Sequence, residues 1–439
     1  MPDAVEPNPG PASMGTWLTV PAMRANLRAQ ARLVVQLVRW VAMGAVVGVL
    51  AGVSSAAFLE ALRWATDTRL ANGWLVWLLP AGGLAVGLVY HYLGGRSGGG
   101  NSLIIEEIHD PVAWVPRRLA PLVFGGTIVT HILGGSAGRE GTAIQMSGSL
   151  TDAMSRLVRL NREDRRLMLI AAISGGFGAV FGVPIAGCVF GLEVQAIGRV
   201  RYEALAPALA ASLVGDLVVR GLGVDHALQP HLDVELTAAL AAKVAVAGLA
   251  FGLASLAFVA LTHAVKHTSA RYLRWPPLRP LVGGLAVLGL MGLAGTRDYL
   301  GLSLPLAAGA TAGGAGIVAA AFAWKIVFTA VTVGTGFPGG EVTPLFVIGA
   351  TLGVTMGRLL DVPIPLMAAI GFVAVFAGAT NTPLACTIMG VELFGGDGVA
   401  LFAIGCVVAY IFSSHRGIYT TQRVATHPAV ARPAPSRDG

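Results

Sequence analysis

Two glycine-rich segments of the sequence place an acidic residue beside small residues at what looks like the start of a helix. The first is "GREGT" (138–142), which contains Glu140, and the second is "GGEVT" (339–343), which contains Glu341. Glycines allow backbone conformations that are closed to other residues, and the first amides of a helix have no partner within it. Such amides bind anions, so both segments are candidate anion sites.

A third segment of the same kind is "GGRSGGGNSLIIEEI" (94–108). Its glycine-rich loop ends at Asn101, a favourable N-cap residue, and an apolar helix is predicted to follow. Because the three helix starts come without phosphate chemistry, they indicate a small inorganic anion.

The elements that position these segments are predicted to lie in a lipid bilayer. The chain has 439 residues, of which 55% are hydrophobic and only 12% are charged, and its mean hydropathy is +0.71. A soluble domain of this length needs far more polar side chains to cover its surface. The composition therefore predicts an all-α polytopic membrane protein.

The apolar runs fall into two length classes. The runs 37–62, 71–95 and 238–265 each exceed the roughly 20 residues with which a helix crosses the hydrocarbon core. Shorter runs, broken by glycine, proline or charge, cover 118–135, 139–150, 167–177, 185–197 and 344–357. Short helices are tolerated in a bilayer where their ends face protein or water, so we expect half-crossing helices that meet inside the protein.

The sequence contains an internal repeat of about 200 residues. "GREGT" aligns with "GGEVT" at an offset of 201, and "GAVFGVPIAGCVFGLEV" aligns with "AGATNTPLACTIMGVEL" at an offset of 199. The second alignment places Pro184 on Pro383 and Glu193 on Glu392. We predict two halves at about 36–222 and 236–412, with the substrate site where the halves meet.

Basic residues flank the apolar region at both ends. Arg24, Arg28 and Arg32 follow at a spacing of four and share one helix face, and four arginines follow Tyr410. These flanks predict that both termini are cytoplasmic, in a bacterial-type inner (plasma) membrane, and "RLVRLNREDRR" (156–166) is expected to be another inside loop. The predicted domains are an N-terminal segment with a basic amphipathic helix at 1–35, a transmembrane domain at 36–412 and a C-terminal tail at 413–439.

No metal or cofactor is expected. Cys188, Cys386 and Cys406 lie in apolar runs without metal-ligand spacing and are expected to pack in the interior. The formal net charge of +7 is in keeping with the basic flanks and does not indicate a nucleic-acid partner.

Taken together, the motifs resemble the CLC family of anion transporters from about residue 36 to residue 422. The resemblance is carried by "GREG", "GFPGGEVTPLFVIGATLG", the paired "FGVPIAGCVFGLE" and "NTPLACTIMGVE", and Tyr419 in "HRGIYTTQ". It implies a CLC fold with two inverted-topology repeats, and a homodimer whose subunits each have a complete pore. It also implies that Glu140 is the gating glutamate and Tyr419 the inner tyrosine.

This resemblance gives a role to the acid at the first glycine-rich segment. Charge inside a membrane is costly and is usually functional. A carboxylate beside an anion path can take the place of the anion when ionised and leave when protonated, which links anion and proton movement. Val194 stands where chloride/proton antiporters of the family have an inner glutamate, so the proton is expected to travel by Glu140 alone.

Further departures from the chloride-type pattern are similar to the fluoride-exporting branch of the family. Asn101 replaces an anion-contacting serine, Thr142 replaces a proline, and Glu341 and Thr343 replace apolar residues. Fluoride is strongly hydrated, so its site needs strong donors, and Asn101 offers two N–H groups and Thr343 a hydroxyl. The predicted function is a fluoride/proton antiporter that exports fluoride, with Glu140 as its gating and proton-carrying residue. The candidate anion-binding residues are Asn101, Gly138, Arg139, Gly141, Glu341, Val342, Thr343 and Tyr419.

Several of these residues have a purely structural alternative. Asn101 can serve only as a helix cap, and Thr343 can bond only a backbone carbonyl. Glu341 can be a structural acid that helix-start amides satisfy, and Tyr419 can be an interface residue. A permanent pair of Glu140 with its neighbour Arg139 is a further alternative, although the two side chains would point about 100° apart on a helix.

Two polar residues and three aromatic residues in apolar runs have a mainly structural interpretation. Lys325 and His131 are expected to be packing or snorkelling groups. Three aromatic residues are expected to line or support the path, with a plain packing role in the core as the alternative, namely Phe181, Phe190 and Phe346.

Three other functions compete with fluoride/proton antiport. The first is a chloride channel or a chloride/proton antiporter of the same family. The second is an intramembrane enzyme that uses Glu140 and His131, which the absence of an HExxH motif disfavours. The third is a structural membrane scaffold, which leaves the intramembrane acids unexplained.

Overall fold

The computed structural model describes residues 20–226 and 229–424, and side chains from residue 30 onward. The predicted N-terminal segment and C-terminal tail therefore lie partly outside the described residues. The helices are α1 (Val20–Ala71), α2 (Leu79–Val89), α3 (Gly100–His109), α4 (Leu119–Ile132), α5 (Glu140–Leu157), α6 (Arg162–Phe181), α7 (Pro184–Glu193), α8 (Leu205–Gly221), α9 (Ala238–Tyr272), α10 (Leu278–Ala294), α11 (Leu304–Thr311), α12 (Ala321–Gly334), α13 (Val342–Leu360), α14 (Ile364–Thr380), α15 (Pro383–Phe394) and α16 (Val399–Phe412). The short strands β1 (Ala196–Ile197) and β2 (Arg423–Val424) pair in parallel.

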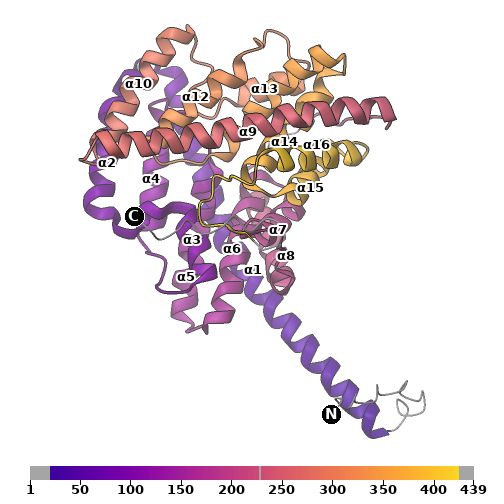
Figure 1. The fold of residues 1–439 in the computed structure, drawn as a ribbon. Coiled ribbons are helices and arrows are strands. Elements are labelled where there is room, and N and C mark those ends of the chain that lie inside the picture. The colour runs from indigo at the N-terminus through magenta and orange to yellow at the C-terminus, as the bar shows by residue number, and fades with distance from the viewer. Residues whose placement is uncertain (1–19, 227–228, 425–439) are drawn as a thin grey trace, which may run out of the picture.

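Five helical segments of the described chain are long and apolar enough to cross a membrane. The helices α1 and α9 contain the predicted runs 37–62 and 238–265, and the N-terminal part of α1 extends beyond the other helices (Figure 1). The predicted run 71–95 falls largely in one of these segments, Gly73–His109, but this segment is built from several short helices rather than from a single α-helix. A 3-10 helix (Gly73–Leu78) precedes α2 and a π-helical turn (Tyr90–Gly94) follows it. Pro80 lies in the first turn of α2, where its missing N–H ends the preceding helix.

Several interior helices are too short to cross a bilayer. The helix α4 has 14 residues and α7 has 10, which at 1.5 Å per residue gives about 21 and 15 Å against a hydrocarbon core of about 30 Å. The predicted inside loop 156–166 is shorter than expected, because α5 continues to Leu157 and α6 begins at Arg162. Asn161 caps α6 by accepting a hydrogen bond from the amide of Asp164 (2.8 Å).

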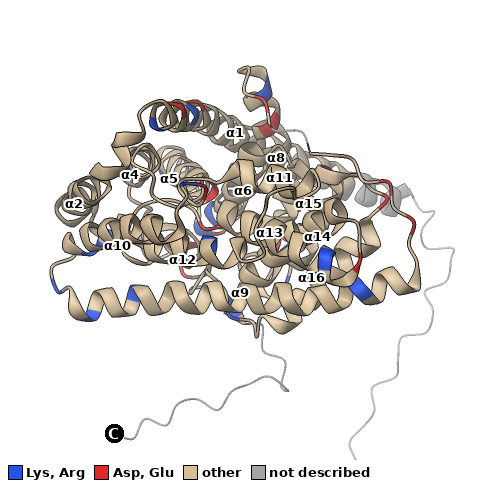
Figure 2. Ribbon diagram, turned by 90° about the horizontal axis from the view of Figure 1, so that it is seen from above, with Lys and Arg blue, Asp and Glu red and all other residues tan. Residues whose placement is uncertain are grey.

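The interior helices lie between two long helices. In Figure 2, α1 and α9 run along opposite sides of the molecule, and charged residues are sparse between them. The helices α13 and α14 pack tightly, because Gly349 faces Gly371 and a Cβ on either would collide with the carbonyl of the other. Nearly all residues of these two helices are buried, so they form the centre of the molecule.

The residues aligned by the repeat also meet in space. The carboxylate of Glu193, at the end of α7, accepts hydrogen bonds from the amides of Ala385 (2.8 Å) and of the residue before it (3.1 Å), at the start of α15. The carboxylate of Glu392 does the same at the start of α7, with the amides of Ala186 (2.7 Å) and its predecessor (2.9 Å). Each half therefore caps a helix of the other half with a carboxylate, that of Glu193 being buried.

Candidate anion site

The starts of α5 and α13 are joined through their glycines. The amide of Gly138 donates to the carbonyl of Gly340 (2.6 Å), and the amide of Gly340 donates to the carbonyl of Gly138 (2.8 Å). This antiparallel bridge places the two Gly-Glu-Thr segments side by side. Two helix N-termini, one from each half, thus lie at the same point.

The carboxylate of Glu140 is bound by the first turn of the opposite helix. Its Oε1 accepts a hydrogen bond from the amide of Thr343 (2.9 Å) and one from the amide of Arg139 (3.2 Å). The hydroxyl of Thr343 also donates to Oε1, so this hydroxyl bonds a carboxylate rather than only a backbone carbonyl. Glu140 is 0% exposed, and the donors that hold it are of the kind that binds a small anion.

The second carboxylate oxygen of Glu140 lies against two glycines. A Cβ would lie 2.5 Å from Oε2 at Gly340 and 2.6 Å from it at Gly138. Oε2 has no hydrogen-bond partner among the described residues. The glycines therefore give the carboxylate room to enter, while a single turn of α13 supplies most of its donors.

Arg139 does not pair with Glu140. Within the described chain no ion pair links the two side chains, and the guanidinium lies over the ring of Phe181, 5.6 Å from its centroid. The alternative of a permanent pair is therefore wrong for this conformation.

Asn101 lies beside the GREGT segment (138–142) but is not a helix cap. The helix α3 begins at Gly100, with φ +56°, and its N-cap is Gly99, so Asn101 lies within the first turn. Its Nδ2 would be 3.0 Å from a Cβ on Gly141, and its buried Oδ1 has no partner. The cap predicted for Asn101 is thus corrected, while its closeness to the GREGT segment was expected.

Glu341 occupies the N-cap position of α13 and faces a cavity of about 560 Å³. The cavity is called the Glu341 cavity here, and Asn101, Lys266 and Tyr419 also line it. The carboxylate of Glu341 makes no hydrogen bond or ion pair within the described chain, so helix-start amides do not satisfy it. Val342, the next residue, is buried at 1% exposure and carries no donor in its side chain.

Tyr419 lies in the interior rather than on an outer surface. It is 5% exposed, and its hydroxyl has no partner among the described residues. It shares a small space with Asn101 and Val194. Gln422 holds this segment in place, because its Nε2 donates to the carbonyls of Val194 (2.7 Å) and Thr380 (2.8 Å).

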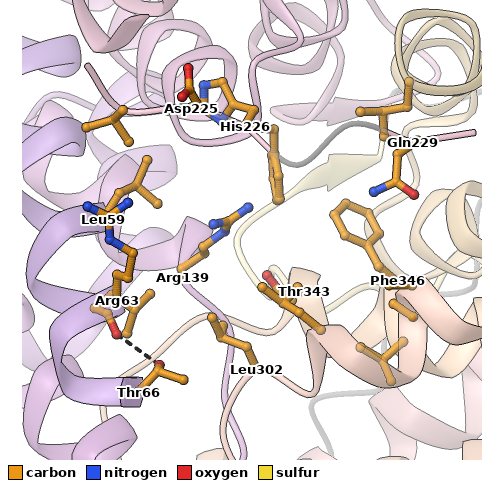
Figure 3. A pocket seen from close by; sticks show the side chains of 18 of the residues that line it. Leu59, Arg63, Thr66, Arg139, Asp225, His226, Gln229, Leu302, Thr343 and Phe346 are labelled. Atoms are coloured by element: carbon orange, nitrogen blue, oxygen red, sulfur yellow. Dashed lines mark hydrogen bonds between the residues drawn. The ribbon is translucent and has the colours of Figure 1, made fainter. Parts of the chain in front are cut away.

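A second cavity, of about 340 Å³, is lined by Arg139 and Thr343, whose amides bind the Glu140 carboxylate. Figure 3 shows Arg139, Thr343 and Phe346 around this cavity, called the Arg139 cavity here, with His226 above them. Burial, followed by the charge of Arg139, lowers the pKa of His226 to about 4. The imidazole is therefore neutral at pH 7, and Arg139 is the permanent positive charge beside Thr343.

Two polar residues expected to pack or snorkel differ in their surroundings. His131 packs as expected, with its ring nitrogens 2.8 Å and 3.1 Å from the carbonyls of Thr127 and Ala137. Lys325 does not snorkel, because it is 0% exposed and its Nζ lies among four oxygens. Of the two expected roles, Lys325 therefore has interior packing and not snorkelling.

Two residues near the site were missed in the sequence. Gln145, which is 8% exposed, lies within 3.7 Å of a Cβ on Gly100, and Lys266 lines the Glu341 cavity. The available signal for Lys266 was a lone lysine just after the long apolar run 238–265. The three cysteines are free and buried, and no metal-ligand group of three or more residues occurs in residues 20–226 and 229–424.

Comparisons with known proteins agree with the CLC resemblance. The family model described as voltage gated chloride channel matches residues 82–414. A chloride/fluoride channel protein of Pseudomonas syringae pv. tomato is 47% identical over 410 residues, which cover 91% of this chain and 89% of the relative. The crystal structure of a CLC-type fluoride/proton antiporter has a TM-score of 0.86 at 34% identity and covers 89% of this chain and 98% of that chain. A slow cyanobacterial Cl⁻/H⁺ antiporter shares the fold, with a TM-score of 0.74 at 21% identity over 87% of this chain and 96% of that chain.

Proposed function

The chain belongs to the voltage gated chloride channel (CLC) family of multi-pass membrane proteins, and we propose that it is a fluoride/proton antiporter that exports fluoride. Fluoride is named in the descriptions of the chloride/fluoride channel relative and of the similar antiporter structure. The observation that carries the proposal is the contact between Glu140 and the first turn of α13. The family transports ions and is not a family of enzymes.

The donors around Glu140 suit a small, strongly hydrated anion. Moving such an ion out of water is costly unless hydrogen bonds replace its hydration shell. The backbone amide and the hydroxyl of Thr343 are two such donors. The side-chain amide of Asn101 lies next to Gly141, in the first turn of α5. We infer that fluoride takes these donors when the carboxylate leaves them.

In this mechanism Glu140 is both the gate and the proton carrier. When ionised, its carboxylate competes with fluoride for the amide and hydroxyl of Thr343. When protonated, it loses its charge and is released, so fluoride can enter. The residues that bind the buried carboxylate line the Arg139 cavity, and the neighbouring Glu341 lines the other cavity, so we propose that movement of the carboxylate opens a path between the two.

A single acid carries the proton in this proposal. Val194 lies with Asn101 and Tyr419 at the small space near the Glu341 cavity and cannot titrate. Glu341 faces that cavity together with Lys266. We propose that Glu341 is one of the anion-binding residues, at the entrance to the anion path. Tyr419 then marks the cytoplasmic end of the path.

We further propose a homodimer with both termini in the cytoplasm. The short helices α7 and α15, with α8 and α16, present exposed apolar side chains such as Ile185, Leu217, Leu384 and Ile411. Short helices leave backbone ends that lipid cannot satisfy, so a protein partner on this face is favourable. Cysteine cross-linking at Leu217 should give a disulfide-linked dimer, whereas an exclusively monomeric product would remove this proposal.

Selectivity tests the proposed function directly. Purified protein in liposomes loaded with fluoride or with chloride should release fluoride far faster, as followed with ion electrodes. The reason is that donors replace the chloride-type serine and apolar positions at Asn101 and Thr343. Equal efflux of the two ions would instead favour a chloride channel, and chloride efflux coupled to protons would favour a chloride/proton antiporter.

A further inference from the structure

One face of α12 holds the loop that leads to Glu140. Lys325, Thr329 and Thr332 follow at spacings of four and three, so they share a helix face. Ser136, four residues before Glu140, accepts a hydrogen bond from Nζ of Lys325 (2.9 Å), and its hydroxyl lies 2.9 Å from that of Thr329. Its amide donates to the hydroxyl of Thr332 (3.2 Å). The loop before the gate is therefore fixed on α12.

The side chain of Lys325 ends in a cage of oxygen atoms. Besides the loop hydroxyl, Nζ lies within hydrogen-bonding distance of the carbonyls of Tyr299 (3.2 Å) and Gly301 (2.9 Å) and of the hydroxyl of Ser303 (2.8 Å), so the three protons of an ammonium group are shared among four acceptors. Carbonyls can only accept, and the Ser303 hydroxyl donates its own proton to the carbonyl of Leu300 (3.4 Å). Acceptors on all sides are the environment of an ammonium ion rather than of a neutral amine.

A second cation adjoins this cage. Arg69, at the end of α1, is 8% exposed, and its Nη2 would be 3.1 Å from a Cβ on Gly301, whose carbonyl bonds Lys325. The Nε of Arg69 is buried without a partner. Among the residues that the structure describes, no carboxylate pairs with either cation. The positive charge of Lys325 and Arg69, beside the loop that leads to Glu140, is therefore not neutralised by a neighbouring carboxylate.

We propose that Lys325 and Arg69 are positioning residues that supply positive charge to the Glu140 site. This charge stabilises the ionised carboxylate and, after the carboxylate leaves, the anion that replaces it. The inference rests on the proposed function. Because Ser136 and Glu140 are four residues apart, their Cα atoms are separated by at most about 14 Å. At an effective dielectric constant of about 20, one charge at such a distance shifts a protonation equilibrium by roughly 0.5 to 1 pH unit.

Other charged and titratable groups surround the two sites and stay in place in the test. They are His131, Arg297 and Tyr299 on the side of the cations, and Arg139, Glu341 and Tyr419 on the side of Glu140. Because none of them is altered, a shift in the pH profile reports the charge that the substitution removes.

The test compares Lys325→Met with Thr329→Val. The first removes the charge with little change of length, and the second breaks the hydroxyl contact with Ser136 while the charge remains. The measurement is fluoride-driven proton uptake into liposomes as a function of pH. Lys325→Met should move the half-maximal pH upward by about 0.5 to 1 unit, because the protonated carboxyl of Glu140 is favoured when a nearby positive charge is lost. Thr329→Val should keep the half-maximal pH of the parent.

Arg69→Met is the second charge-removing variant, in case Lys325→Met does not fold. It should shift the profile in the same direction. The proposal is overturned if the folded charge-removing variants have the profile of the parent, or if Thr329→Val shifts it equally, because loop geometry would then be the cause.

Anion binding separates this proposal from the proposed function. Calorimetric titration of purified protein with fluoride and with chloride should give about 3- to 10-fold weaker anion binding for Lys325→Met. A parent that shows no fluoride-driven proton uptake overturns antiport, while the comparison of anion affinities still decides the role of the charge. A parent that binds neither ion overturns both.

Discussion

Replacing Thr343 by valine removes a single donor from the anion site while its shape is kept. In the structure the hydroxyl of Thr343 donates to the carboxylate of Glu140, and the backbone amide of the same residue donates as well. Valine retains the amide and loses the hydroxyl. Combining the substitution with Glu140→Ala removes the competing carboxylate, so fluoride itself reports the missing donor.

The magnitude follows from the burial of the site. Thr343 is 1% exposed, so water cannot readily replace the lost donor. A hydrogen bond to a charged group contributes about 1.5 to 3 kcal/mol, and each 1.4 kcal/mol is a factor of ten in affinity. Thr343→Val should therefore weaken fluoride binding by about 10- to 150-fold.

Isothermal titration calorimetry with fluoride measures this loss in the Glu140→Ala background. Thr343→Ser is the matched control, since serine keeps the hydroxyl and should bind within about 3-fold of threonine. If the valine variant binds fluoride as tightly as the threonine parent, the hydroxyl does not contact the ion, and Thr343 serves only to hold the closed gate.

Three other substitutions test separate parts of the structure. Asn101→Ala should slow electrode-measured fluoride efflux by about 5- to 150-fold through a lost donor, and efflux at the rate of the parent would mean that Asn101 is structural. Glu193→Gln replaces one of two acceptor oxygens at the start of α15, so thermal unfolding in detergent should show a loss of about 1 to 3 kcal/mol, and an unchanged melting temperature would contradict this. Asp152→Asn leaves the buried Arg165 poorly neutralised, since Arg165 Nε lies 2.5 Å from Asp152. It should destabilise the protein by about 3 to 5 kcal/mol in the same assay, and a stable variant would show that Glu107 alone suffices.

The contact between the two Gly-Glu-Thr segments could be predicted from the sequence, because the internal repeat places them at equivalent positions in the two halves. Aligning "GREGT" with "GGEVT" placed two helix starts at equivalent positions, and the bridge between Gly138 and Gly340 brings them together. The aligned acids Glu193 and Glu392 likewise exchange caps. In both cases the sequence pattern is local, and the duplication supplies the long-range contact.

Other features depend on contacts that no local pattern contains. The helix α3 begins at Gly100, whose backbone has a positive φ. Asn101 therefore lies within the first turn of the helix and does not cap it. The cage around Lys325 is built from Tyr299, Gly301 and Ser303, which precede it by 22 to 26 residues, and from Ser136 in the other half. A lysine in an apolar run therefore indicates a packing or snorkelling group, and its oxygen partners cannot be predicted from the run itself.

The central claim is that the Glu140 carboxylate exchanges places with fluoride and carries the proton. Proton uptake driven by a fluoride gradient into liposomes tests this claim most directly, with the parent and Glu140→Gln compared at neutral pH. Glutamine keeps the shape and cannot be ionised, so we expect uptake in the parent and none in the variant. Uptake by Glu140→Gln at the rate of the parent would contradict the account and would show that another acid, such as Glu341, carries the proton.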